Sequence, residues 1–549
     1  MGELEKPPEA QKTGSLFLKG TLVLTVAGMV VKVIGSINWI ILSRVLGGEG
    51  IGLYQMAFPL YLLALCVSSA GIPVAISIIT AEKLAHRDYC GAKRVFFLAT
   101  AVLAVTGAFF SLLLYIGAGW LIEYRFIRDP RAYYSLIALS PAIFLVTLLS
   151  SFRGYLQGWQ IMTPTAVSQI VEQVFRVAAM LFFASAFLKK GLEYAAGGAS
   201  LGAGAGAAAG LIVLLYYYRR LQKSLRLAQE NQNAGAIRES SASLIRRIAK
   251  LALPVSLSSI MLPLVANLDL AVVPVRLEAA GYTVEQATEL FGYLTGMAVP
   301  LVNLATILTA ALATSLVPAV SEAYSQGDLP RVLQRAAAAT RLASLVTIPA
   351  SVALWLLAGP VAVIVYHAPQ AGGVIRVLAA GVFLLGLHQV STSVLQGMSR
   401  TSVPVVNMGV SAAVKVILNW WLTALPFLGI LGAAWATVAD IGLAAALNLY
   451  SVYRYTGFIP DFKGLGKSAA AAIGMGAAII LAYDAAEAAA WGGIPAALAA
   501  LAAGSVVYGA MLLALGGINA RDVERLPVVG VRLANALRAM GLLRKTVLD

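Results

Sequence analysis

The sequence predicts an all-α polytopic membrane protein with about 14 transmembrane helices. Hydrophobic residues make up 60% of the chain and charged residues only 12%, and the mean hydropathy is +0.83. Soluble globular proteins are about half apolar and about a quarter charged. The apolar residues also occur in runs of about 20 or more, which is the length that a helix needs to cross a bilayer.

The predicted spans follow one another along the chain and are separated by short polar connections. They cover residues 15–43, 51–80, 94–118, 132–155, 164–188, 197–218, 248–274, 288–319, 336–357, 372–396, 403–424, 430–453, 468–486 and 492–515. Residues 1–14 form a polar N-terminus. Residues 219–247 form a basic linker, and residues 516–549 form a basic tail with amphipathic helical spacing.

An internal repeat divides the spans into two sets. Met56–Leu60 (MAFPL) recurs as Met297–Leu301 (MAVPL). Leu156-Gln-Gly recurs as Leu395-Gln-Gly at nearly the same separation, and a proline follows each copy. The separation spans an even number of helices, so both sets have the same orientation. We therefore expect two six-helix lobes, residues 15–218 and 248–453, related by a pseudo-two-fold axis along the membrane normal. The two helices within 454–515 lie outside the repeat.

Four prolines fall within predicted spans of the two lobes: Pro59, Pro73, Pro300 and Pro318. Proline removes a backbone hydrogen bond and bends a helix. The equivalence of Pro59 and Pro300 in the repeat favours bends with a role in transport, although prolines are common in membrane helices generally.

The distribution of basic residues predicts the topology. Cations near the end of a span are counted with the adjoining connection. Of the 40 Lys and Arg residues, 29 then belong to the N-terminus, even-numbered connections or the C-terminus, 8 belong to odd-numbered connections, and 3 lie well inside spans. Cytoplasmic segments carry the excess of Lys and Arg. Both termini are therefore expected in the cytoplasm.

The first span contains a lysine near its middle. A lone ammonium at that depth costs roughly 2.5–3.5 kcal/mol on insertion scales, so Lys32 should face protein or water rather than lipid. Polar and small residues around it share a helical face, namely Thr21, Thr25, Gly28, Lys32, Ser36 and Ser43. The sequence favours a cation in an aqueous cavity, with snorkelling of the lysine to the interface as the alternative. Arg44 marks the other end of this span.

Other spans carry charges that could neutralise one another. Glu172 and Arg176 are four residues apart on one helical face and can pair. In the second lobe, Asn407 and Lys415 share a polar stripe, and Asp440 on the next span could neutralise Lys415. These are structural interpretations, and a direct substrate role is left open for Arg176.

The seventh span is the repeat partner of the first. It carries Asn267 and Asp269, and Arg276 lies seven residues after Asp269 on the same face. Asp269 and Lys32 could therefore face each other across one cleft. We take Lys32, Arg44, Ser36, Asn267, Asp269 and Arg276 as candidate substrate-binding residues.

No catalytic group, metal site or cofactor motif is recognised. The two cysteines and three histidines lack metal-ligand spacing. The segment Asp461–Ser468 resembles a phosphate-binding loop, but it lacks the first glycine and a preceding strand. We expect a transporter rather than an enzyme, acting as a monomer and without a nucleic-acid partner.

Three stretches carry a family resemblance: GGEGIGLYQMAFPLYLLALCVSSAGIPVAISIITAEKLA, SFRGYLQGWQIMTPTAVSQIVEQVFRV and LQGMSRTSVPVVN. They resemble the branch of the multidrug/oligosaccharidyl-lipid/polysaccharide (MOP) exporter superfamily that holds stage V sporulation protein B and polysaccharide biosynthesis proteins, related to MurJ-type lipid II flippases. The resemblance implies two lobes around a cavity lined by helices 1, 2, 7 and 8. It also implies a lipid-tail groove at the last two helices, within 454–515.

The resemblance implies a flippase for an undecaprenyl-pyrophosphate-linked glycan, with lipid II as the first candidate. A cationic cavity would stabilise the pyrophosphate, and the membrane potential or a coupled Na⁺ or H⁺ would drive its movement. Two alternatives stay open at this point. One is a cation-coupled multidrug exporter of the same superfamily, and the other is a non-transporting scaffold for cell-wall or spore-cortex synthesis.

Overall fold

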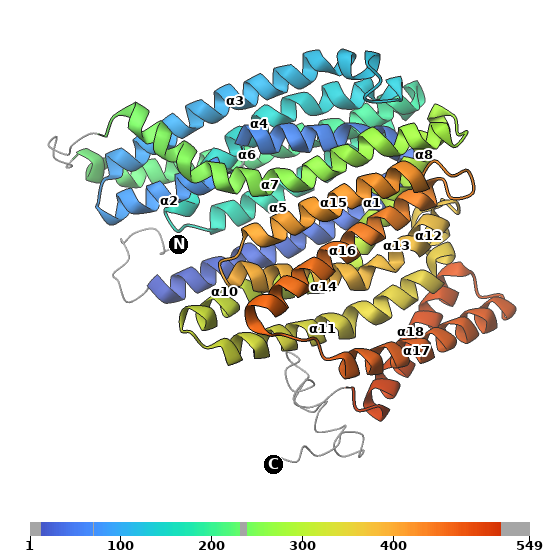
Figure 1. Ribbon diagram of the computed structural model, residues 1–549. Coiled ribbons are helices and arrows are strands. Elements are labelled where there is room, and N and C mark those ends of the chain that lie inside the picture. Colours follow the sequence, from blue (N-terminus) through green and yellow to red (C-terminus); the bar gives the residue numbers. More distant parts are fainter. Residues whose placement is uncertain (1–12, 70, 231–238, 518–549) are drawn as a thin grey trace. The chain divides into compact units, whose positions relative to one another are not determined.

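A computed structural model describes residues 13–69, 71–230 and 239–517 of the chain. Its contacts divide the chain into two compact units, residues 1–296 and 297–549. Helices are the only regular elements within the described residues (Figure 1). In the part of the chain that the structure describes, twelve helices are long and apolar enough to cross a membrane, or 13 when a bent pair counts as one span. The chain is therefore a multi-pass helical membrane protein.

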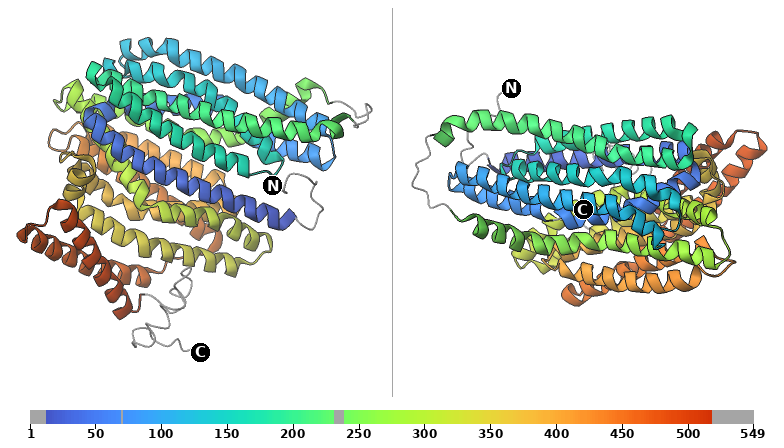
Figure 2. Two further views of the ribbon diagram at one scale, coloured as in Figure 1. Left: turned by 180° about the vertical axis from the view of Figure 1, so that it is seen from behind. Right: turned by 90° about the horizontal axis from the view of Figure 1, so that it is seen from above.

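Unit 1 contains eight α-helices, two short 3-10 turns and the start of a π-helical segment. They are α1 (Thr13–Ser69), α2 (Ile72–Ala85), α3 (Tyr89–Glu123), η1 (Pro130–Ala132), α4 (Tyr133–Gly158), α5 (Thr163–Phe187), η2 (Leu188–Lys190), α6 (Leu192–Glu230), α7 (Ser241–Ala279), α8 (Val284–Gly292) and η3 (Tyr293–Ala298). Within this unit α4 packs on α3 and α6, and α5 packs on α6 and α1. Figures 1 and 2 show the long helices α3–α7 running side by side.

Unit 2 contains the remaining helices. They are α9 (Val299–Ala305), α10 (Ile307–Ser325), α11 (Leu329–Leu356), α12 (Ala358–Tyr366), α13 (Ala371–Ala379), α14 (Gly381–Gly397), α15 (Ser402–Leu422), α16 (Ile430–Thr456), α17 (Phe462–Ala488) and α18 (Gly493–Ala514). Here α14 packs on α10, α11 and α16, while α17 pairs with α18 and lies against α11.

The predicted span count differs from the structural count mainly at α1. The stretch Val26–Ala85 is counted as one span of 60 residues. A helix of that length would extend about 90 Å, against a hydrocarbon core of about 30 Å. Gly47 interrupts it with φ 66° and ψ −175°, between the predicted spans 15–43 and 51–80. The number fourteen stays a prediction, as do the lobe boundaries and their symmetry axis.

Two segments differ from their predicted form. The linker predicted at residues 219–247 is helical at both ends, because α6 continues to Glu230 and α7 begins at Ser241. The span predicted at 288–319 is broken into α8, η3, α9 and α10. Gly292, Gly296 and Pro300 lie in this stretch, and glycine and proline are the residues that weaken a continuous helix. The predicted tail, from residue 518 on, lies outside the described residues.

A stripe of glycines positions α5. Gly198, Gly202, Gly206 and Gly210 recur every fourth residue on α6. A Cβ added at Gly206 would stand 2.6 Å from the carbonyl oxygen of Glu172, so the two backbones touch there. The small residues of the Gly/Ala-rich segment 195–210 thus permit close helix packing. One side of α5 is thereby held against α6.

Candidate functional site

Lys32 lies in the middle of the first part of α1, and its side chain is exposed. Among the described residues its ammonium has no hydrogen-bond or ion-pair partner. One turn later the Ser36 hydroxyl donates to the Lys32 carbonyl oxygen at 3.0 Å. The predicted polar stripe does not stay on one surface, because Ser43 is fully buried and donates to the Trp39 carbonyl oxygen at 2.6 Å. Close to the break at Gly47, the face of α1 that carries the polar stripe is therefore buried in the protein. Arg44 is exposed.

A second group of charges lies between α4 and α5, and we call it the arginine cluster: Arg153, Glu172 and Arg176. The Arg153 guanidinium donates to a carboxylate oxygen of Glu172 at 2.8 Å and to the Ser168 hydroxyl at 2.8 Å. Arg176 donates to the other oxygen of Glu172. The sequence predicted the pair Glu172–Arg176 from its spacing.

Sequence reasoning missed Arg153. The charge count assigns it to the cytoplasmic end of the fourth span, and it lies 19 residues before Glu172, so no helical spacing connects the two. The position of Arg153 could have indicated its role. Arg153 lies more than one turn before the end of α4, so it is inside the helix, and the next helix, α5, has a polar face that could receive it.

The arginine cluster adjoins α1. A Cβ added at Gly35 would lie 3.3 Å from the Nε2 atom of Gln173, which follows Glu172 on α5. Gly35 comes three residues after Lys32, so the first part of α1 packs on the polar face of α5 close to that lysine. Tyr54 and Tyr61, on the second part of α1, are both buried.

The candidate residues on α7 differ in their surroundings. Asn267 is buried, and its amide donates to the carbonyl oxygens of Pro59 and Pro263, both at 2.8 Å. It ties α7 to the second half of α1. Asp269 and Arg276 are half-buried, and each has an interaction within the protein. The pairing of Asp269 with Lys32 stays a prediction.

The four prolines occupy two kinds of position. Pro59 and Pro318 lie inside α1 and α10, whereas Pro73 and Pro300 lie in the first turns of α2 and α9. Proline is well tolerated in a first turn, because that N–H has no helical partner. At Pro73 the chain thus begins a new helix, whereas Pro300 follows the π-helical segment η3 without an intervening turn.

In unit 2 two charges of the predicted polar network pair with each other. Lys415 on α15 and Asp440 on α16 approach to 3.9 Å. Asn407 donates to the Asn448 side-chain oxygen at 2.8 Å, and the Asn448 amide donates to the Thr392 hydroxyl at 2.9 Å. These contacts join α14, α15 and α16 and support the structural interpretation of this polar stripe. Among the described residues no three His, Cys, Asp or Glu side chains gather as metal ligands.

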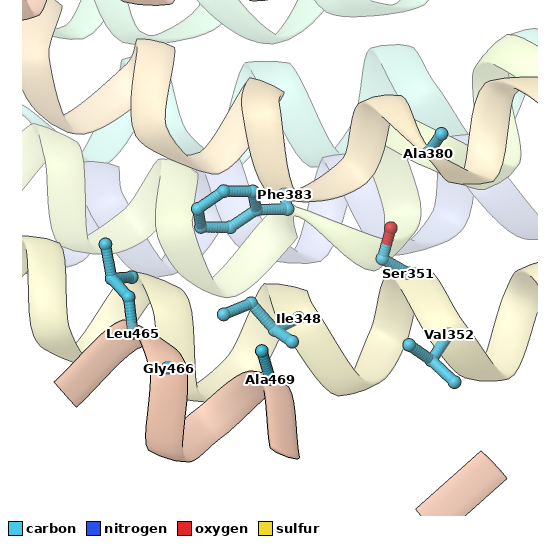
Figure 3. A pocket seen from close by; sticks show the side chains of 8 residues that line it. All are labelled: Ile348, Ser351, Val352, Ala380, Phe383, Leu465, Gly466 and Ala469. Atoms are coloured by element: carbon cyan, nitrogen blue, oxygen red, sulfur yellow. The ribbon is translucent and has the colours of Figure 1, made fainter. Parts of the chain in front are cut away.

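Unit 2 also contains an apolar groove of about 430 Å³ between α11, α13–α14 and α17 (Figure 3). We call it the α17 groove. Ser351 lines the groove, and its hydroxyl donates to the Ala379 carbonyl oxygen. The groove lining is therefore apolar. The lining residues are Ile348, Ser351, Val352, Ala380, Phe383, Leu465, Gly466 and Ala469.

The sequence of this chain matches known protein families. Residues 17–324 match the family model described as polysaccharide biosynthesis protein, and residues 295–421 match the model described as MatE. The chain belongs to the polysaccharide biosynthesis protein family. Within the MOP superfamily it lies in the branch that includes stage V sporulation protein B and MurJ.

Two relatives from Bacillus subtilis (strain 168) illustrate the relationship. The chain is 32% identical to stage V sporulation protein B over 522 residues, which cover 94% of this chain and 98% of the relative. It is 27% identical to the lipid II flippase MurJ over 463 residues, which cover 81% and 84% of the two chains.

Solved structures support the fold. A lipid II flippase MurJ structure in an inward closed conformation superposes with a TM-score of 0.68 at 16% identity, covering 92% of this chain and 100% of that one. An inward-facing multidrug resistance MATE transporter of the MOP superfamily gives a TM-score of 0.61 at 15% identity, covering 78% and 94%. At these identities the similarity establishes the MATE/MurJ-like fold.

Proposed function

We propose that this polysaccharide biosynthesis protein flips an undecaprenyl-pyrophosphate-linked glycan, with lipid II as the substrate, from the inner to the outer leaflet by alternating access. The observation that carries the proposal is the excess of cations on the polar helices of unit 1. Lys32, Arg153 and Arg176 lie on neighbouring helices, and within the described ranges Glu172 is the one carboxylate bonded to the two arginines.

A pyrophosphate headgroup cannot cross hydrocarbon unaided, because its charges lose their hydration. Lysine and arginine bind phosphate oxygens through charge-assisted hydrogen bonds. In our proposal the exposed ammonium of Lys32 receives the pyrophosphate. A multidrug exporter for cations would need the opposite balance, with uncompensated carboxylates.

The lipid tail needs a hydrocarbon surface throughout the movement. The α17 groove offers such a wall, and two of its three sides come from α11 and α17. We propose that it holds part of the polyprenyl chain while the headgroup is translocated. The notion of a tail groove at the last two helices also rests on the resemblance to MurJ-type flippases.

The proposed direction follows from charge. With both termini in the cytoplasm of a bacterial cell, an anion moves outward down the potential by about 2.3 kcal/mol per charge per 100 mV. Co-movement of Lys32 in the field would reduce that gain. Whether the potential alone, Na⁺ or H⁺ drives turnover is part of the proposal to be tested.

A growth assay tests the proposed function. Cells depleted of their lipid II flippase should regain growth when they express this chain, and a Lys32→Glu variant at equal membrane level should fail. Rescue of drug resistance instead of growth would favour a multidrug exporter. Failure of the wild-type chain in both assays would leave the scaffold alternative.

A further inference from the structure

The charges of the arginine cluster do not balance. Glu172 gives one carboxylate oxygen to Arg153 at 2.8 Å and the other to Arg176. Among the described residues, no other carboxylate interacts with either guanidinium. Arginine keeps its proton in proteins, so the cluster carries one surplus positive charge.

The surplus charge lies where it is costly. Arg176 is at the middle of the 25-residue helix α5. The three side chains of the cluster retain only 12–25% of their exposed surface. The Nε atom of Arg176 is buried and has no hydrogen-bond partner among the described residues. An unpaired charge inside a membrane marks a functional site by default, because burial without a counter-ion is strongly unfavourable.

An ion pair of unit 2 provides a comparison. Lys415 and Asp440, a cation and an anion, approach to 3.9 Å. Glu172 in unit 1 instead bonds two cations, and the additional arginine calls for a ligand. The α6 glycines also fix the α5 backbone at Glu172 and Arg176, so that the polar groups are held in place before any ligand arrives.

We propose that the arginine cluster is an anion subsite for a phosphoryl group, in which Arg176 exchanges its bond to Glu172 for bonds to the anion. Glu172 then remains on Arg153, which Ser168 also holds. The planar guanidinium fork matches two phosphate oxygens. This inference rests on the proposed function, because the phosphoryl group we assign is that of the lipid-linked substrate.

Glu172 has a defined task in this account: it neutralises Arg176 when the subsite is empty. Replacing it with Gln should leave both guanidiniums available and trap the anion. We therefore expect Glu172→Gln to tighten anion binding by about tenfold and to slow release, since charged hydrogen bonds contribute strongly to affinity. A residue with a merely structural role would weaken binding and turnover together.

The test measures thermal unfolding of the purified full-length protein during titration with inorganic pyrophosphate and with farnesyl pyrophosphate. The wild type should be stabilised by both ligands, with higher affinity for the lipid. Arg176→Gln should lower both affinities by about tenfold or more. Arg335→Gln is the matched control, because Arg335 pairs with Glu322 in unit 2 and should leave both titrations unchanged.

Several results would overturn the proposal. One is equal binding by wild type and Arg176→Gln, and another is weaker binding by Glu172→Gln. If inorganic pyrophosphate binds as tightly as the lipid, the assignment to a lipid headgroup is wrong. Should Arg176→Gln fail to fold, Arg176→Lys and Glu172→Gln decide the question, because each retains a polar group at its position. A lack of flipping activity with these affinities intact would contradict the proposed function alone.

Discussion

Lys32 is the residue on which the proposed chemistry depends most. It is exposed in the middle of the first part of α1, although charged residues are rare there. The sequence identified it from its depth in an apolar run, which is a local property. The contact of Gly35, three residues after Lys32, with Gln173 depends on how α1 and α5 pack, and no spacing rule contains that information.

The flipping activity of Lys32 variants should depend on the charge of the new side chain more than on its shape. Lys32→Arg should retain part of the flipping activity, because guanidinium also binds phosphate. Lys32→Ala should lose most of it, and Lys32→Glu should lose all of it by repelling the headgroup. Flipping rates at matched protein levels check this order, with Lys189→Glu at the exposed turn η2 as the control. Full activity of Lys32→Glu would remove Lys32 from the binding site.

The arginine cluster was only partly predictable from the sequence. Glu172 and Arg176 are one helical turn apart, so their pairing was predictable. Arg153 reaches Glu172 from another helix, and only the packing of α4 and α5 on α6 brings them together. Sequence therefore predicted a neutral pair where the structure contains a cluster with a surplus charge.

At the scale of elements, a close crossing joins the second part of α1 to α8. Gly48 and Gly52 on one side meet Thr288 and Gly292 on the other, each pair at four-residue spacing. A Cβ added at Gly52 would stand 2.0 Å from the Thr288 carbonyl oxygen. Gln55 then donates to the Thr295 carbonyl oxygen at 2.8 Å. Small residues permit this contact, as they do between other membrane helices.

A methyl group at this crossing should separate the two helices. Gly52→Ala should destabilise the protein by about 1–3 kcal/mol, because backbone atoms cannot give way as a flexible side chain can. The melting temperature should fall relative to the wild type. The control is Gly117→Ala, whose Cβ would meet nothing within 4 Å. An unchanged melting temperature for Gly52→Ala would show that the crossing is not tightly packed.

The helices themselves were largely predictable, but their interruptions were not. Long apolar runs predicted most of the helices from α3 to α7 and from α15 to α18. The sequence placed one continuous span at residues 288–319, where the structure has a π-helical segment, η3, and a turn at Thr306. The residues before and after such an interruption are equally apolar, so hydrophobicity does not reveal it. The backbone geometry depends instead on local glycines, on Pro300 and on the packing of α8 against α1.

The α17 groove yields a prediction of its own. Ala469→Trp should fill part of the groove and slow the flipping of lipid-linked substrates, while expression stays normal. Ile473→Trp is the control on the same helix, because Ile473 is 73% exposed and lies outside the groove lining. Flipping assays on both variants check this. Equal activity would mean that the lipid tail travels elsewhere.

At the scale of the whole molecule, the direction of transport depends on topology. In a background lacking Cys66 and Cys90, Lys223→Cys on α6 should be protected from impermeant thiol reagents in intact cells. Glu123→Cys at the end of α3 should be labelled, because it belongs to a connection predicted outside. Both positions are exposed on the protein, so protection reports the side of the membrane. The reverse labelling pattern would invert the predicted topology.

The most direct measurement is transbilayer movement of a fluorescent undecaprenyl-pyrophosphate-linked glycan in proteoliposomes. The account predicts rapid movement with the wild-type chain and movement no faster than in protein-free vesicles with Lys32→Glu at the same protein density. A wild-type rate equal to that of protein-free vesicles, under a membrane potential and with Na⁺ and H⁺ gradients supplied, would contradict the claim that this chain is a lipid-linked glycan flippase.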